Sequence, residues 1–332
     1  MNRLSLLAPL VVTCTVWIVA RDLPAQPKAT AKPLAPFNLA ALNTKADEDD
    51  PYVSRDGMRL LYTSNASGHY TLLSTQQRNR IQFFPGSERW PAGTELEGQN
   101  TDFDNCSPYL TADSHDLYYA EKTLVKAPPG ERQAPANFDI AHAIKLTKPT
   151  QFTGPTYVQS VCTPDEEMHP WLTEDGLELY FSRKTKDGWR VFSARRPPAT
   201  KKEPAGAFGE PAMIQDLPAG YHHATLSRDN RTMYLQGPLP NNRWGIFRAQ
   251  RLGVKQPWGA PELLEGLNDP KAPTGDTSPC LSRTGSLRSV GDRDAVVQEM
   301  RPPADLSTTR SLAGETWKRG SWRMSRRRSA SG

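Results

Sequence analysis

The sequence has few cysteines, and their placement excludes two common kinds of cross-linked protein. Only four of the 332 residues are cysteine, and no Cys-x-x-Cys pair occurs. Cys106, Cys162 and Cys280 are widely spaced, which fits neither a disulfide framework nor a cysteine zinc site. They also fall at different positions of the repeat described below. We therefore expect no disulfide bridge.

Short catalytic motifs and long helices are also missing. There is no Gly-rich phosphate loop, no G-x-S-x-G nucleophile elbow and no His-Glu-x-x-His zinc motif. This argues against nucleotide-binding proteins, α/β-hydrolases and the common zinc proteases. The 30 prolines and 23 glycines interrupt the chain too often for long helices. Many short elements joined by turns are expected instead.

The net positive charge of the protein comes from one end of the chain. The formal net charge is +5, but residues 283–332 alone carry 11 Lys/Arg and 5 Asp/Glu. The preceding residues have a net charge of −1. A basic surface for nucleic acid is therefore not predicted for the body of the protein.

The N-terminal segment is typical of an export signal. Arg3 precedes an apolar run from Leu4 to Ala20. The sequence predicts a signal peptide at residues 1–26, a linker at residues 27–35, and a periplasmic or secreted protein. An uncleaved anchor is the alternative, since the run has the shortest length that spans a bilayer. Lipidation at Cys14 is a further alternative, although the residues before Cys14 match a lipoprotein motif poorly.

One sequence motif, which we call the phrase, occurs in five copies along the chain. Its first copy reads Asp50-Pro51-Tyr52-Val53-Ser54-Arg55-Asp56-Gly57, and a strand-like Leu60-Leu61-Tyr62 follows. The other copies begin at Ser107, His169, His223 and Ser278, at spacings of 57, 62, 54 and 55 residues. Such regular self-similarity is typical of a repeat architecture.

Each copy of the phrase predicts two strands joined by a tight turn. In the Ser/Thr-x-Asp-Gly core the Asp side chain can bond the backbone two residues on, and Gly accepts the tight conformation. The residues to which we assign this structural turn role are Asp56, Gly57, Asp113, Asp175, Gly176, Asp229 and Gly285. Recurrent strand aromatics are expected to pack between the units: Tyr62, Tyr119, Tyr180, Phe181 and Tyr234.

Two further strand-like segments complete each unit, so the predicted fold is all-β. Four short strands per 55-residue unit describe one blade of a β-propeller. We expect the propeller at residues 36–285, with five or six four-stranded blades, the last one incomplete. The segment from Phe37 to Leu42 is expected to act as an N-terminal closing strand.

The repeat resembles the WD-repeat-like propeller repeats of TolB and related bacterial envelope proteins. The likeness rests on Ser-x-Asp-Gly after an aromatic residue and before a Leu-Tyr-Phe-Ser type strand, over about residues 36–285. The usual Pro before the Asp is replaced in every copy, by Arg55, Ala112, Glu174, Arg228 and Arg283. The resemblance implies a binding scaffold of the cell envelope.

The fifth copy of the repeat is incomplete. After Gly285 the expected aromatic strand is absent, and residues 286–332 are rich in Arg and Ser. We interpret them as an irregular basic tail, and a shifted reading frame near residue 284 is our hypothesis for its origin. A disordered tail that contacts acidic lipid or polymer is the alternative.

One repeat position offers candidate metal ligands. His169 and His223 occupy the position that Asp50 holds in the first copy. Equivalent positions of successive blades lie on one ring, so these three side chains could converge near the channel and hold a divalent metal. Glu166, Glu167 and Asp276 are expected close by. The alternative is that the three are polar residues that cap strand starts. No catalytic residue and no other cofactor is predicted.

Three functions remain open from the sequence. The first is a non-enzymatic, monomeric scaffold that binds a protein or an envelope glycan through its loops, with membrane contact only through an uncleaved signal or lipid. The second is an enzyme, such as a metal-dependent polysaccharide lyase, that uses the His169/His223 ring. The third is a truncated family member without activity.

Overall fold

The structure is a computed structural model, which describes residues 37–39, 41–77, 90–123, 137–281, 287–291 and 294–300. At residues 37–38, 287–291 and 294–300 it describes the backbone alone. The chain divides into two units, residues 1–30 and 31–332, and every described residue belongs to the second. The predicted signal peptide and linker therefore lie outside the described residues, as do Gly285 and residues 301–332.

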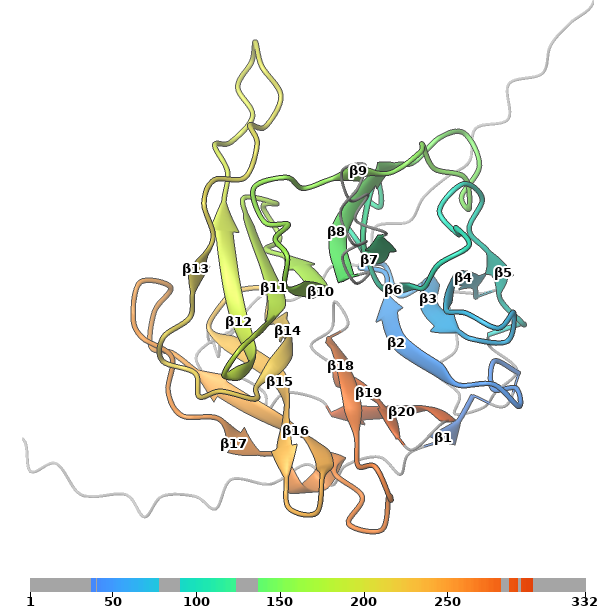
Figure 1. Cartoon of the computed structure of the whole chain (residues 1–332), viewed down its shortest axis with the longest axis vertical. Coiled ribbons are helices and arrows are strands. Elements are labelled where there is room, and N and C mark those ends of the chain that lie inside the picture. The colour runs from blue at the N-terminus through green and yellow to red at the C-terminus, as the bar shows by residue number, and fades with distance from the viewer. Residues whose placement is uncertain are drawn as a thin grey trace, which may run out of the picture. The chain divides into compact units, whose positions relative to one another are not determined.

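The described part of the chain is all-β, as predicted, and four antiparallel sheets form blades of a propeller (Figure 1). Each blade contains four strands in chain order, and the fourth strand is only two residues long. The strands of these blades are β2 (Glu48–Val53), β3 (Arg59–Ser64), β4 (Thr71–Gln76) and β5 (Thr94–Glu95); β6 (Asn105–Leu110), β7 (Asp116–Thr123), β8 (Asn137–Ile144) and β9 (Thr156–Tyr157); β10 (Glu166–Leu172), β11 (Glu178–Thr185), β12 (Gly188–Arg195) and β13 (Ala212–Met213); and β14 (His222–Leu226), β15 (Thr232–Leu239), β16 (Arg243–Gln250) and β17 (Glu262–Leu263).

A fifth four-stranded sheet combines the two ends of the described chain. Its order is β1-β20-β19-β18, where β1 is Phe37–Asn38, β18 is Thr277–Leu281, β19 is Leu287–Gly291 and β20 is Asp294–Met300. Phe37 pairs with Val297 and Asn38 with Val296. The prediction of five or six blades is therefore corrected: four blades consist of consecutive strands, and this last sheet is composite.

The predicted end of the propeller at residue 285 also differs from the structure. Strands β19 and β20 lie within residues 286–332, which the sequence predicted to be irregular. The prediction relied on the missing aromatic residues. Strand pairing, however, uses backbone groups, and a free strand edge together with β-branched residues such as Val290, Val296 and Val297 suffices for it.

One strand of each sheet lines the common axis: the first strand of each complete blade, and β18 in the composite sheet. Strand β2 contacts β6, β6 contacts β10, β10 contacts β14, β14 contacts β18, and β18 contacts β2. The sheets thus follow one another around a common axis (Figure 1). One short 3₁₀ helix, Glu265–Leu267, is the only helix among the described residues.

The second strands carry the core. Tyr62, Tyr119, Tyr180 and Phe181 are at most 5% exposed, which confirms the predicted packing between blades. Tyr234 is only partly buried. Burial of large aromatic side chains is the main favourable contribution to such an interface, so the recurring aromatics explain why successive blades stack.

The Ser/Thr-x-Asp-Gly turns are tied by their own side chains. Asp56 accepts hydrogen bonds from the Ser54 hydroxyl at 2.6 Å and from the Met58 amide at 3.0 Å. The equivalent Asp113, Asp175 and Asp229 each accept a hydroxyl at 2.6 Å. The residue that directly follows the aspartate of each turn has positive φ: Gly57, Ser114, Gly176 and Asn230. These carboxylates are therefore occupied within their turns.

Candidate axial metal centre

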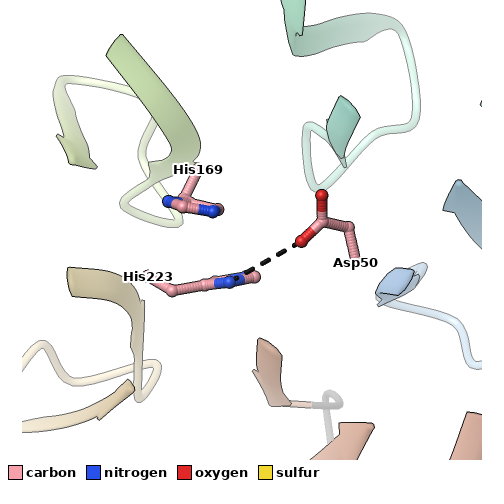
Figure 2. Close-up of side chains that lie close together, drawn as sticks. All are labelled: Asp50, His169 and His223. Atoms are coloured by element: carbon pink, nitrogen blue, oxygen red, sulfur yellow. Dashed lines mark ion pairs between the residues drawn. The ribbon is translucent and has the colours of Figure 1, made fainter. Parts of the chain in front are cut away.

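Three side chains from three blades meet in the channel. Asp50 of β2, His169 of β10 and His223 of β14 each offer one ligand atom, and these atoms lie within 4.8 Å of one another. Figure 2 shows the two imidazole rings one above the other, with the Asp50 carboxylate beside them. They border a cavity of about 20 Å³ that only inner-strand residues line. A cavity of this size holds one water molecule or one ion.

The backbone of the inner strands explains why these side chains reach the axis. In all five sheets the ladder between the innermost strand and the strand that follows it has a bulge at the same repeat position. The residue there is left-handed in every case, with φ between 50° and 56°: Asp50, Ser107, His169, His223 and Ser278. Four of the five precede a proline, which lacks the amide that would continue the ladder. The bulge re-aims the side chain.

Asp50 is held in place by its neighbours in the ring. Its carboxylate accepts hydrogen bonds from the amide and the hydroxyl of Ser107, both at 2.9 Å, and from the Ser278 hydroxyl at 3.3 Å. The Ser278 hydroxyl also lies 2.7 Å from Asp49. The serines of the other two repeats therefore orient the carboxylate toward the histidines.

The two histidines stack on each other. Their ring centroids are 4.2 Å apart with the planes inclined by 20°. Nδ1 of His223 lies 3.7 Å from a carboxylate oxygen of Asp50 (Figure 2). Nδ1 of His169 and Nδ1 of His223 are both buried without a hydrogen-bond partner. A buried imidazole nitrogen without a partner is costly unless something else satisfies it.

Burial shifts the titration of the whole cluster toward the neutral forms. It lowers the pKa of His169 well below its usual value and also lowers the pKa of His223. It raises the pKa of Asp50, although hydrogen bonds from Ser107 and Ser278 act in the opposite direction. Two neutral rings in the channel keep their lone pairs at neutral pH, which is the form that binds a metal.

His222, next to His223, contacts His169 and two tryptophans. Its ring stacks on Trp189 with centroids 5.2 Å apart and meets Trp244 edge-on at 4.9 Å. Its Nδ1 lies 3.0 Å from the Gly220 carbonyl oxygen, and burial lowers its pKa to about 4. Its ring also lies 5.6 Å from His169. This aromatic support was not foreseen from the sequence, because Trp189 and Trp244 are distant from His222 in the chain.

Three predicted neighbours of the cluster have other partners. Glu167 is fully buried and pairs with Arg183 at 2.7 Å, and Glu166 pairs with Lys184 at 3.0 Å. Asp276 accepts the Asp269 amide at 2.7 Å. Their expected place beside the cluster was inferred from chain proximity. Residues two apart share a face in a regular strand, but the ladders shift register between Met168 and Trp171 and between Thr277 and Cys280, so the alternation is broken there. Ser107 and Ser278, which share the repeat position of the ligands, are the neighbours instead.

Cysteine does not contribute to the site through a bridge. Within the described ranges no disulfide bridge joins Cys106, Cys162 or Cys280. No helix of the described residues is long and apolar enough to cross a membrane.

Comparison with known proteins shows the fold but no family. No known family profile matches the chain, and no curated protein matches it. A GH62 hydrolase solved with xylotriose has a TM-score of 0.50 at 9% identity, over 78% of this chain and 93% of that one. A thermostable family-43 glycoside hydrolase has a TM-score of 0.50 at 12% identity, over 77% of this chain and 90% of that one. A TolB protein of Agrobacterium tumefaciens has a TM-score of 0.45 at 15% identity, over 77% of this chain and 76% of that one.

Proposed function

We propose that the protein is a binding module of the cell envelope whose channel holds a divalent transition-metal ion at Asp50, His169 and His223. The observation that carries the metal proposal is the approach of three ligand atoms to within 4.8 Å around one small cavity. Two imidazole nitrogens and a carboxylate oxygen form a set that suits zinc, iron, nickel or copper. The two Nδ1 atoms that have no hydrogen-bond partner are the groups that a metal would satisfy.

The envelope location and the partner class rest on other features. The predicted signal peptide and the resemblance to WD-repeat-like, TolB-like repeats support a periplasmic or secreted protein. A monomeric propeller presents its loops around the channel, and the proposed partner is a protein or an envelope glycan.

Metal content tests the proposal directly. Purified protein, stripped with EDTA and reloaded with Zn²⁺ or Co²⁺, should bind one ion per chain. His169→Ala and His223→Ala should each lower the affinity by at least tenfold. His115→Ala is the matched control, since this ring is 54% exposed and pairs with Asp116 outside the cluster. Equal metal uptake by all three variants would contradict the site.

A second candidate function is a metal-dependent enzyme that acts on a polysaccharide, such as a lyase. Its support is that three protein ligands leave a coordination position open, as in catalytic rather than structural metal sites. The GH62 and family-43 hydrolases share the fold but not the sequence. Release of reducing ends or unsaturated products by the metal-loaded protein, and not by His169→Ala, would favour this function.

A third candidate is a truncated family member without activity. It would be favoured by a full-length chain that melts without cooperativity and binds neither metal nor glycan. A sharp thermal transition together with one bound metal ion per chain would exclude it.

A further inference from the structure

A second, larger cavity opens at the other end of the inner strands. Its volume is about 670 Å³, within the usual range for small-ligand sites. It lies where the inner strands lead into the Ser/Thr-x-Asp-Gly turns, and residues from all four complete blades line it. Tyr52 and Trp171 border both this cavity and the small axial one. The larger cavity, which we call the turn-side pocket, therefore lies directly beyond the histidine cluster.

The inner wall of the turn-side pocket is aromatic and rigid. Tyr52, Tyr109 and Trp171 occupy one repeat position, and their ring centroids are 5.0 to 6.0 Å apart. The Tyr52 hydroxyl donates to the Leu110 carbonyl at 2.5 Å, and the Tyr109 hydroxyl donates to the Leu172 carbonyl at 2.9 Å. Since both hydroxyls are used between blades, Tyr52 and Tyr109 offer only ring carbon to the pocket. Each is 6% exposed, so the partly buried Trp171 is the most accessible ring of the wall.

The rim of the turn-side pocket is an ion-paired triad. Arg55, Glu174 and Arg228 occupy the repeat position just before the turn Asp, in three different blades. One oxygen of Glu174 pairs with Arg55, and the other lies 2.6 Å from Nε of Arg228. Each guanidinium has five N–H groups, so donors remain after the carboxylate is bound. Glu174 thus holds two planar donors at the mouth of the pocket.

We infer that the turn-side pocket binds a neutral sugar unit of a glycan. An aromatic wall packs against the apolar face of a pyranose ring, and the planar Arg and Glu groups match pairs of hydroxyls. The charges of the lining residues balance, with Arg55 and Arg228 opposite Glu174 and Asp229, which favours an uncharged ligand. The inference deepens the binding role proposed above and does not depend on the metal.

The test is a calorimetric titration of the full chain with maltotriose, mannotriose and N,N′,N″-triacetylchitotriose, with trigalacturonate as the anionic comparison. At least one neutral trisaccharide should bind saturably, and more tightly than trigalacturonate. Trp171→Ala and Arg228→Ala should weaken that binding at least tenfold. Arg228 is 72% exposed, so its variant should fold even if the Trp171 variant does not.

Arg195→Ala is the matched control. It removes another exposed Arg–Glu pair, with Glu178 at 2.8 Å, which does not line the pocket; binding should be unchanged. Binding should also persist in EDTA, which separates this pocket from the metal proposal. The inference is overturned if no neutral trisaccharide binds, if only trigalacturonate or an added peptide binds, if Arg228→Ala binds at full strength, or if EDTA abolishes binding.

Discussion

At the scale of single residues, the ring of left-handed residues around the axis is the most unusual feature. A non-glycine residue in this conformation costs about 1–2 kcal/mol, and five lie at equivalent positions. Strained backbone concentrates where a side chain must be aimed. The sequence aligned Asp50, His169 and His223, but it could not predict their positive φ, because no residue type at this position requires it.

Glycine and alanine at position 223 should separate the backbone strain from the loss of the ring. His223→Gly should be more stable than His223→Ala by about 1 kcal/mol, since glycine accepts a φ of 51° freely. Urea unfolding in EDTA measures the difference. The neighbouring His222 is the control: its φ is not positive, so His222→Gly should be the less stable variant of its pair. If glycine were more stable than alanine at both positions, or less stable at both, the backbone strain at His223 would be contradicted.

Asp276 should make stability depend on pH. Burial, aided by Asp269, raises its pKa from 3.8 to about 6, against hydrogen bonding by the Asp269 amide and the charge of Arg243. The folded state therefore holds the proton more tightly than the unfolded state, and the contribution of Asp276 to stability falls as pH rises from about 4 to about 6. Asp276→Asn, which still accepts the amide, should gain roughly 2 kcal/mol over the native chain between pH 4 and pH 7.

Thermal melts of both proteins across this pH range provide the measurement. Asp187→Asn, in an exposed turn, is the matched control. A stability difference between Asp276→Asn and the native chain that stays constant with pH would show that Asp276 ionises normally.

At the scale of elements, the hairpins were the most predictable part of the structure. Their signal is local: an Asp that caps its own turn, a Gly with positive φ, and apolar residues on both sides. The two-residue outer strands, such as β5 and β9, have no comparable signal, because their pairing depends on the neighbouring strand rather than on their own residues. The turn-side pocket was also missed. Arg55, Glu174 and Arg228 stood out as departures from the family pattern, but their convergence depends on the curvature of the ring.

The turn glycines allow a clean test of hairpin geometry. A methyl group added at Gly57 or at Gly154 meets no atom within 4 Å, but only Gly57 has positive φ, at 71°. Gly57→Ala should therefore destabilise the protein by about 1 kcal/mol, and Gly154→Ala should be neutral or slightly stabilising. Chemical denaturation measures both. Equal effects would mean that the turn relaxes to accept alanine.

At the scale of the whole molecule, the repeat predicted the propeller but not the number of its blades. The spacing fixed which segments are inner strands, and those strands do follow one another around the axis. The composite fifth sheet was harder to predict, since its last strands lack the aromatic pattern. Only the role of the N-terminal segment was foreseen, where Phe37 and Asn38 pair with β20.

Two truncations test what the composite sheet contributes. A chain that ends at residue 301 keeps β19 and β20 and should melt as cooperatively as the full chain. A chain that ends at residue 286 removes both strands, so β1 and β18 lose their sheet partners and two strand edges are exposed. It should lose the sharp transition and aggregate on heating. Identical calorimetric profiles for the two chains would show that the fifth sheet is dispensable.

Because β1 pairs with β20, the composite sheet can form only after both strands have been synthesised. As the chain leaves the ribosome, Phe37 and Asn38 emerge more than 250 residues before the strand that receives them. Strand β1 must therefore stay unpaired until β20 has been synthesised. A gene rearranged so that its ends fall between two complete blades would place β1 directly after β20, and the last step of folding would then move to a different blade.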